Sequence, residues 1–324
     1  MIVAFVEHDG GRTDRSSLEA LTLARRLAER SGEPLEALLV GDGAEAAGRQ
    51  LGDHGVSTAH LVGDPRLADY SPAAWGRVLA QLVASRGADL VLAAGTDRGH
   101  EVVAHAAAFS GHAMAANCVE VEPGEPFRLT RQRWAGSLLE DATLDGPVRF
   151  LTIAEHVVEP EQAAGAVAVR LETIEPEVVE ADLRSRVVAR VEPEAGTISL
   201  ADARVVVGGG RGVGSSEGFA ELEELAGLLG AAIGVSRVVT SAGWRPHSMQ
   251  VGQTGTQIAP DLYIACGISG AIQHIVGCKA AKAILVVNTD REAPIMSRAS
   301  YAVIGDLHTV VPAISAEIRR VTGR

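Results

Sequence analysis

Small and polar residues are concentrated between Gln250 and His274, on both sides of a short apolar run. The segment reads QVGQTGTQIAPDLYIACGISGAIQH and is rich in glycine, serine, threonine and glutamine. Amides, hydroxyls and an imidazole are donors and acceptors that a hydrocarbon core would leave unsatisfied. We therefore expect this segment to line a site for a heteroaromatic ligand with several carbonyl oxygens and ring nitrogens.

A glycine run, GGGRGVG at Gly208–Gly214, directly follows the apolar residues 205–207. A run so rich in glycine lets the backbone approach a phosphate while the amides of a helix start face the anion. An ordinary glycine-rich turn is an equally good interpretation. The chain has no G-x-x-x-x-G-K-[ST] motif, so P-loop chemistry is disfavoured. A ligand that carries a phosphate would account for both this glycine run and the polar segment.

The three cysteines do not predict a metal site or a disulfide framework. Cys118, Cys266 and Cys278 are scattered and form no C-x-x-C pair, so we expect no metal. A reducing compartment suits this usage. The first ten residues lack the basic and long apolar regions of a signal peptide, and the expectation is a cytoplasmic protein.

The charge balance disfavours some classes of binding partner. The formal net charge is −12, from 29 basic and 41 acidic residues, which argues against binding to a nucleic-acid backbone. No apolar stretch reaches the roughly 18 residues of a membrane span, so direct membrane insertion is not expected. Aromatic residues make up only 3% of the chain, too few for the stacking platforms of single-strand binders.

Short apolar runs alternate with helical patterns in the first half. Strands are expected at 2–7, 35–40, 59–62 and 90–94, and helices at 16–31, 72–86 and 100–109. Shorter β segments follow at 119–122, 127–134, 137–144 and 149–153. This alternation predicts βαβ units and a mostly parallel sheet.

Residues 155–196 are rich in proline, glutamate and valine, and the domain boundary is expected there. We assign an N-terminal α/β domain to residues 1–185, a linker to 186–199 and a second domain to 200–324. An edge strand at 187–191 is the alternative to a linker.

The second half repeats the alternation. Strands are expected at 204–207, 231–233, 262–266, 283–287 and 302–304, and helices at 218–229, 270–277 and 310–321. The fold class is therefore α/β, with two domains that each hold a mostly parallel βαβ sheet, the C-terminal one doubly wound. Three of these strands run into Gly208, Gly267 and Asn288, at the sheet edge where such folds bind ligands.

The order and spacing of five motifs identify a resemblance. G-G-R-G, S-R, V-G-Q-T-G, G-I-S-G-A-I-Q-H and N-x-D followed by G-D-L occur in register over residues 204–312. Together they resemble the α subunits of electron transfer flavoproteins, the FixB family. A-F-V-E-H at 4–8 and A-A-G-T-D-R-G-H-E at 93–101 are similar more loosely, so the resemblance covers essentially the whole chain.

The resemblance implies a heterodimer of α and β subunits with one FAD, held mainly by the C-terminal domain of α. It implies an N-terminal domain that is similar to adenine-nucleotide hydrolases and forms the partner interface, and AMP or a second FAD is possible in β. Single electrons would pass from flavin dehydrogenases to a membrane quinone oxidoreductase or another acceptor, so the chain is a carrier rather than an enzyme with its own substrate. One alternative is an electron-bifurcating member that oxidises NADH with its β subunit. Another is a sensor module that binds an adenine nucleotide in the N-terminal domain.

The family's cofactor contacts carry over to matching positions. Arg211 would contact the flavin or the pyrophosphate, and Ser236 and Arg237 would lie beside the pyrophosphate and the isoalloxazine ring. The remaining implied contacts are Val251, Gly252, Gln253 and Thr254 at the ribityl chain and ring edge; Gly267, Ser269, Gly270, Ala271, Ile272, Gln273 and His274 at the phosphate-binding helix start and flavin O2; and Asn288, Asp306 and Leu307 at the adenosine end.

Three of these residues are expected to tune the redox potential. A cationic Arg237 would stabilise the negative charge that reduction adds to the flavin. His274 would do the same if burial beside an anion raises its pKa, and Thr254 is the third. The chain departs from the family pattern at Thr256, where many relatives have lysine, and at His308, where many have phenylalanine.

Overall fold

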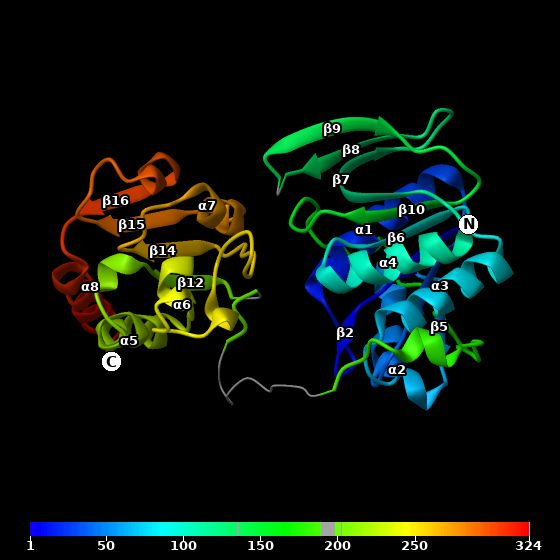
Figure 1. Ribbon diagram of the computed structural model, residues 1–324, viewed down its shortest axis with the longest axis horizontal. Coiled ribbons are helices and arrows are strands. Elements are labelled where there is room, and N and C mark those ends of the chain that lie inside the picture. The colour runs from blue at the N-terminus through cyan, green and yellow to red at the C-terminus, as the bar shows by residue number, and fades with distance from the viewer. Residues whose placement is uncertain (135, 189–197, 202, 324) are drawn as a thin grey trace. The chain divides into compact units, whose positions relative to one another are not determined.

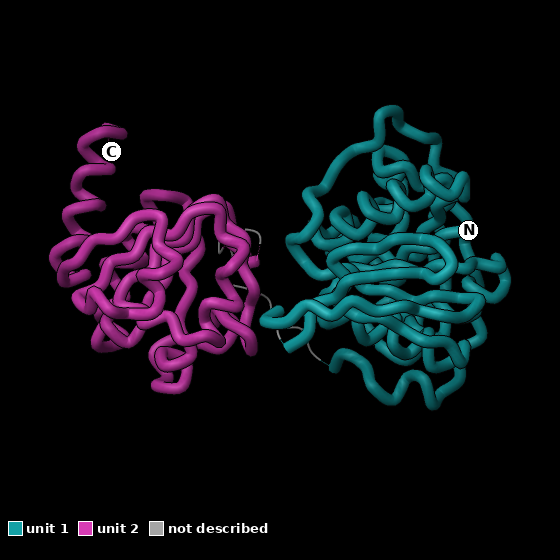
Figure 2. Tube along the Cα trace, turned by 90° about the horizontal axis from the view of Figure 1, so that it is seen from above, with its two compact units in different colours: residues 1–191 teal, residues 192–324 magenta. Residues whose placement is uncertain are grey.

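The computed structural model describes residues 1–134, 136–188, 198–201 and 203–323. The chain forms two compact units, residues 1–191 and 192–324, shown in teal and magenta in Figure 2. The predicted linker, 186–199, includes this junction, but its residues 189–197 lie outside the described part, as does most of the alternative strand at 187–191. Each unit is described by itself below.

The N-terminal unit is built on a nine-stranded sheet with the order β11-β5-β4-β1-β6-β10-β7-β8-β9 (Figure 1). Its parallel strands are β1 (Ile2–Phe5), β4 (Leu35–Leu39), β5 (Thr58–Val62), β6 (Leu90–Ala94), β10 (Arg149–Ile153) and β11 (Arg170–Ile174). β7 (Met114–Glu122) is parallel to β10, and β8 (Arg128–Arg133) and β9 (Leu138–Thr143) extend the sheet in antiparallel pairs. A separate small ribbon joins β2 (His8–Asp9) to β3 (Arg12–Thr13).

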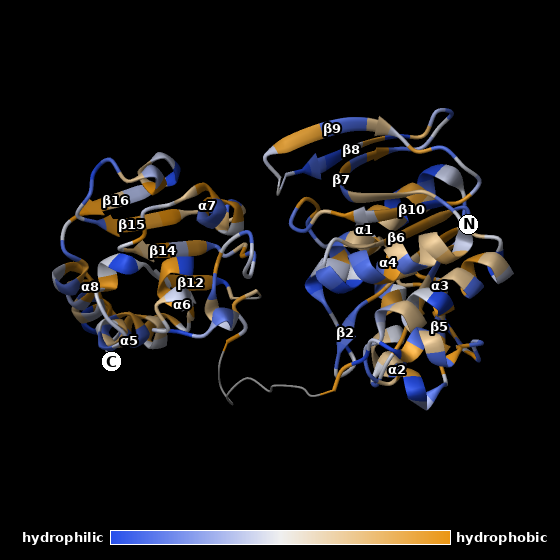
Figure 3. Ribbon diagram, in the orientation of Figure 1, coloured by the Kyte–Doolittle hydropathy of each residue, from blue (hydrophilic) through white to orange (hydrophobic). Residues whose placement is uncertain are grey.

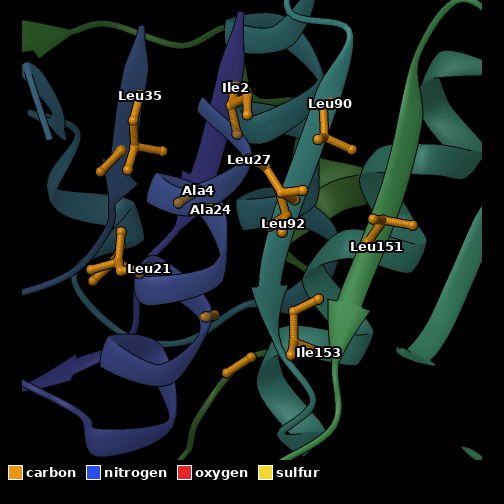
Figure 4. Packing of buried hydrophobic residues seen from close by; sticks show 14 of the residues in the cluster. Ile2, Ala4, Leu21, Ala24, Leu27, Leu35, Leu90, Leu92, Leu151 and Ile153 are labelled. Atoms are coloured by element: carbon orange, nitrogen blue, oxygen red, sulfur yellow. The ribbon is translucent and has the colours of Figure 1, made fainter. Parts of the chain in front are cut away.

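Helices cover both faces of this sheet. α1 (Arg15–Ser31) and α2 (Ala44–Gly48) pack on one face, and α3 (Pro72–Arg86) and α4 (Asp97–Ser110) pack on the other. Short 3₁₀ turns lie at Leu51–His54, Pro65–Leu67 and Glu180–Leu183. Figure 4 shows Leu21, Ala24 and Leu27 of α1 against the apolar side chains of β1, β4, β6 and β10. Continuous apolar strands such as LVLAA in β6 suit a sheet that is buried on both faces.

The C-terminal unit is a five-stranded, all-parallel sheet with the order β13-β12-β14-β15-β16. The strands are β12 (Val205–Gly209), β13 (Ala232–Val235), β14 (Leu262–Cys266), β15 (Ile284–Asn288) and β16 (Tyr301–Ile304). Its helices are α5 (Ala220–Leu229), α6 (Arg237–Ser241), α7 (Ile272–Cys278) and α8 (Leu307–Thr322), with 3₁₀ turns at Arg211–Val213, Glu217–Phe219, His247–Met249 and Pro294–Arg298. Figure 3 shows the apolar character of β12, β14 and β15, which lie between α7 on one face and α5 and α8 on the other.

The predicted fold class is confirmed: both units are α/β, both sheets are mostly parallel, and helices cover both faces of the C-terminal sheet. Pro72–Arg86, Leu90–Ala94, Arg149–Ile153 and Leu262–Cys266 have the predicted bounds. The prediction missed β11 (Arg170–Ile174), which lies in the proline-rich stretch and pairs with β5 as an edge strand. No helix among the described residues combines the length and apolar character that a membrane crossing requires.

Candidate functional site

The site begins where the order of the C-terminal sheet reverses, between β12 and β14. In chain order the strands are arranged 2-1-3-4-5, so the connections from β12 and β14 leave in opposite directions and open a crevice at their carboxyl ends. The two loops that follow these strands are hydrogen-bonded to each other. The amide of Gly210 donates to the carbonyl of Cys266 over 2.9 Å, and the amide of Gly212 donates to the carbonyl of Gly267 over 3.0 Å.

Glycine is required for this contact between loops. A β-carbon at Gly210 would lie 2.3 Å from the carbonyl oxygen of Gly267, and one at Gly212 would lie 2.7 Å from the α-carbon of Gly267. Gly267 itself has a φ of +62°, which L side chains rarely adopt. The three glycines therefore bring two backbones together at the crevice.

The structure places the first part of the glycine run in a strand, whereas the sequence predicted a turn for the whole run. Gly208 and Gly209 lie inside β12 and are not part of a turn. A β-carbon at Gly208 would lie 2.4 Å from the hydroxyl of Tyr263, and one at Gly209 would lie 2.3 Å from the ring of Phe219. These two glycines make room for buried aromatic rings, and the turn begins only at Gly210.

A cavity of about 790 Å³ lies at the crevice, a volume within the range of small-molecule cofactor sites. It is lined by every cofactor-contact residue predicted from the sequence except Ile272, the first residue of α7, whose side chain is 74% exposed. The predicted residues that line it are Arg211, Ser236, Arg237, Val251, Gly252, Gln253, Thr254, Gly267, Ser269, Gly270, Ala271, Gln273, His274, Asn288, Asp306 and Leu307. The structure thus brings together residues from the carboxyl ends of all five strands of this sheet, which are far apart in the sequence.

Other lining residues were not on the list of predicted contacts. They are Gly212, Val238, Ser241, Gln250, Ile268, Val287, Thr289, Asp290, Ala293 and Gly305. Most of them adjoin a predicted residue in the sequence, so proximity was the available signal. Ser241 and Ala293 had no such signal, and Ser241 ends helix α6 (Arg237–Ser241), which was not predicted.

Two arginines carry positive charge at the cavity. Arg211 follows β12 and Arg237 begins α6, and both are exposed. Neither forms an ion pair with another described residue, so their charge is available to an anionic ligand. This arrangement suits a phosphate group, which binds cations and the amides of glycine loops.

A hydrogen-bonded chain of side chains supports Thr254. Gln250 is buried, and its amide lies 2.7 Å from the hydroxyl of Thr240 and 3.0 Å from the hydroxyl of Thr254. The amide of Gln253 donates to the carbonyl of Gln273 over 2.8 Å. The loop that carries Thr254 is therefore held against both α6 and the start of α7.

The side chains at the proposed adenosine end already have protein partners. Asn288 donates to the carbonyl of Ile268 over 2.9 Å and accepts from the amide of Asp290 over 3.0 Å. Asp306 accepts from the amide of His308 over 3.0 Å and so caps helix α8. Both residues line the cavity, and both also hold the loops that shape it.

His274 is a buried residue of α7. Its ring is only 6% exposed, and Nε2 lies 2.8 Å from the hydroxyl of Tyr263. Burial lowers the pKa of His274 to about 4, and the backbone of Val251 opposes that shift only in part. Without a bound anion the imidazole is therefore neutral near pH 7, and the raised pKa expected beside an anion stays a prediction.

The site fits a dinucleotide such as FAD on two counts. Glycines at close-approach positions allow backbone contact, and two cationic side chains suit a pyrophosphate. Within the described residues, no group of His, Cys, Asp and Glu could hold a metal ion.

The N-terminal unit has its own point of strand-order reversal, between β1 and β6, but its chemistry is different. Glu7 follows β1, and its buried carboxylate accepts a hydrogen bond from Thr96, the N-cap of α4. Burial raises the pKa of Glu7 to about 7. The carboxyl group of Glu7 occupies the position at the start of α4 where a ligand phosphate would bind, which argues against a nucleotide at this edge of the N-terminal sheet.

The fold and the cavity define the C-terminal unit as a doubly wound, nucleotide-binding α/β domain. Residues 2–179 match the family profile described as "Electron transfer flavoprotein domain", and residues 199–279 match "Electron transfer flavoprotein FAD-binding domain". The chain belongs to the electron transfer flavoprotein α-subunit (FixB) family, and its C-terminal unit is the FAD-binding domain.

Relatives match over nearly the full length. Protein FixB of Clostridium saccharobutylicum is 34% identical, over 98% of this chain and 96% of the relative. The electron transfer flavoprotein subunit alpha of Clostridium acetobutylicum is 33% identical over 97% and 96%. The subunit alpha of Mycobacterium leprae is 36% identical over 99% of both chains.

Proposed function

We propose that the chain is the α subunit of a heterodimeric electron transfer flavoprotein, with FAD in the cavity between β12 and β14. Single electrons pass from flavin dehydrogenases to a membrane quinone oxidoreductase or another acceptor. The observation that carries this proposal is the convergence of the predicted contact residues on one cavity at the strand-order reversal. The N-terminal domain, residues 1–185, serves as the interface with the β subunit.

The chain's own residues bind and orient the cofactor. Arg211 and the backbone amides after Gly210 and Gly267 hold the pyrophosphate, because cations and amides both attract phosphate oxygens. Ser269 lies in the loop between β14 and α7, where it lines the cavity and donates to the same group. Asn288 and Asp306 shape the adenosine end through their hydrogen bonds to the loops.

The remaining residues tune the flavin. Bound FAD supplies the one-electron chemistry. Arg237 places a positive charge beside the ring, Thr254 offers a hydroxyl, and neutral His274 offers a ring nitrogen. The protein thus sets the electrostatics of the ring and excludes water from one side of it.

Co-expression with the β subunit tests the proposal. We expect a yellow heterodimer with one FAD, which a dehydrogenase donor reduces and a quinone-linked acceptor reoxidises. Ser269→Trp should abolish FAD binding by filling the cavity, whereas Ser110→Trp at the end of α4 should leave it unchanged. A folded, flavin-free wild-type complex that takes up no added FAD refutes the proposal.

A further experiment distinguishes a simple electron carrier from an electron-bifurcating protein. Addition of NADH alone to the heterodimer should leave the flavin oxidised if the protein is a simple carrier. Reduction by NADH would instead support the electron-bifurcating alternative.

A further inference from the structure

Thr240 is a half-buried residue of α6 that neither lines the cavity nor belongs to the predicted contacts. Its hydroxyl lies 2.7 Å from Oε1 of Gln250, and Nε2 of the same amide lies 3.0 Å from Oγ1 of Thr254. One buried amide therefore connects a hydroxyl outside the cavity with a hydroxyl that lines it. Any effect of Thr240 on a ligand is exerted through this connection.

The backbone holds Gln250 in place between the two threonines. Its amide donates to the carbonyl of His247 over 2.9 Å, and its carbonyl accepts from the amide of Thr256 over 2.7 Å. Only 2% of the residue is exposed, so both ends of the side-chain amide need partners close by. The side chain can still turn over, which exchanges its oxygen and its nitrogen.

The two distances decide which way the amide faces. A hydroxyl that donates to an oxygen usually lies about 2.7–2.8 Å from it, whereas an amide nitrogen lies about 2.9–3.0 Å from its acceptor. The contact of 2.7 Å at Thr240 and that of 3.0 Å at Thr254 match these two kinds of bond in that order. A reversed amide would require Thr240 to donate to the carbonyl of Arg237 instead, over the longer distance of 3.0 Å. Thr240 therefore donates to Gln250, and Gln250 donates to Thr254.

This direction leaves the hydroxyl proton of Thr254 unused by the protein. A threonine hydroxyl has one proton to donate and accepts through its lone pairs. Nε2 of Gln250 occupies one lone pair, and no described residue accepts the proton. Thr254 is exposed and lines the cavity, so its proton is available to an acceptor atom there. If the amide were reversed, Oε1 would take this proton, and Thr254 would present only lone pairs to the cavity.

We propose that Thr240 is a positioning residue that, by donating to Gln250, fixes the amide so that Thr254 offers a proton, and not a lone pair, to the bound ligand. This role rests on the proposed flavin site. Neither Thr240 nor Gln250 is among the contacts that the family resemblance implies. A residue of α6 outside the cavity thus sets the hydrogen-bonding polarity of one part of the cavity wall.

Nuclear Overhauser effects in the heterodimer without FAD test the orientation directly. The sample carries ¹⁵N-labelled glutamine and ¹³C-labelled threonine methyl groups. The side-chain amide signal of Gln250 is assigned by its loss in Gln250→Glu, and the two methyl signals by their loss in Thr240→Ser and Thr254→Ser. We expect a stronger effect from the amide protons to the methyl group of Thr254 than to that of Thr240. The opposite order in the wild type overturns the proposal without any further variant.

Thr240→Val removes the hydroxyl and keeps the shape of the side chain. Oε1 of Gln250 then has no donor at position 240, so the reversed amide, which accepts from Thr254, becomes populated as well. The effect to the methyl groups at position 240 should strengthen, and FAD should bind about three- to tenfold more weakly. Thr240→Ser keeps the donor and should bind FAD like the wild type. Thr322→Val is the matched control, because it removes a hydroxyl that donates to a carbonyl of α8 and does not line the cavity; it should change neither quantity.

A double-mutant cycle shows whether Thr240 acts through Thr254. In a Thr254→Val background, Thr240→Val should cause no further loss of FAD affinity, because the hydroxyl that Thr240 directs is already absent. A loss as large as in the wild-type background overturns the positioning role, and so does an unchanged amide or an unchanged FAD affinity in Thr240→Val. A heterodimer that binds no FAD would instead refute the proposed function, and its spectrum would still report the orientation of the amide.

Discussion

Replacing Gly210 by alanine should disrupt the contact between the loops that follow β12 and β14. The backbone angles at Gly210 are φ −110° and ψ −167°, which alanine adopts readily, so the substitution tests space alone. The new β-carbon would lie 2.3 Å from the carbonyl oxygen of Gly267. One of the two loops has to move by about 1 Å to restore ordinary contact.

The magnitude follows from the groups that the methyl group meets. Gly267 accepts from the amide of Gly212 over 3.0 Å, so its displacement strains a loop-to-loop hydrogen bond as well as the packing. Overpacking of this kind costs about 1–3 kcal/mol of unfolding free energy. Because both loops line the cavity, we expect FAD to bind at least about tenfold more weakly, equivalent to about 1.4 kcal/mol.

The assay is FAD titration of the apo-heterodimer by flavin fluorescence, with urea unfolding of the same preparations. Gly227→Ala is the matched control, since Gly227 lies at an exposed position of helix α5 with nothing within 4 Å of the new β-carbon. That variant should keep FAD affinity and gain up to about 1 kcal/mol of stability. Wild-type affinity and stability in Gly210→Ala would refute the role assigned to the loop contact.

Three further predictions concern charge. Burial raises the pKa of Glu7 to about 7, so the contribution of this group to stability is complete below about pH 4.5 and is lost as the pH rises through 7. In urea unfolding, Glu7→Gln should equal the wild type at pH 4 and be more stable at pH 8.5, by up to about 3 kcal/mol. Burial opposes ionisation of Glu36, but hydrogen bonds from Arg86 and His60 outweigh burial and lower the pKa of this carboxyl. The contribution of Glu36 to stability is therefore present above about pH 4.5 and lost in more acid solution. Glu36→Gln should cost about 3 kcal/mol of unfolding free energy at pH 7, and an equal loss at every pH would contradict the reasoning. Arg237→Ala should make the one-electron potential of the bound flavin about 40 mV more negative in a spectroelectrochemical titration, whereas Arg237→Lys should stay close to the wild-type potential because it keeps the charge. Equal potentials in all three proteins would show that Arg237 does not tune the flavin.

Local sequence patterns were sufficient for most of the fold. Runs such as LYIAC in β14 and LVLAA in β6 are apolar and short, and both strands have the predicted bounds. Such strands are buried on both faces, so their hydrophobicity is continuous and visible in the sequence. The strand Arg170–Ile174 was missed because it is an edge strand with only partly buried residues, and pairing with β5 decides its conformation.

The candidate site could be predicted as a set of residues but not as a geometry. Motif spacing indicated the loops after β12, β13, β14 and β15, and the cavity includes residues from each of them. Gly208 and Gly209 were assigned to a turn, because a sequence cannot show that Tyr263 and Phe219 occupy the space beside them. Glycine in a strand and glycine in a turn look alike until the neighbouring strand and helix are in place.

By itself, the sequence determined the fold class, the family motifs and the residues available for a dinucleotide site, because periodicity and residue type are local properties. Only the tertiary structure decided the state of those residues. The protonation of His274 depends on its burial and on a phenol eleven positions away in the chain, which β14 and α7 bring within 2.8 Å. The same holds for Glu7 and Glu36, two carboxyl groups whose pKa values move in opposite directions. Burial dominates at Glu7, where the hydrogen bond from Thr96 offsets it only in part, whereas the hydrogen bonds from Arg86 and His60 outweigh burial at Glu36. Desolvation and hydrogen bonding are set by neighbours in space, and those neighbours are fixed only when the chain has folded.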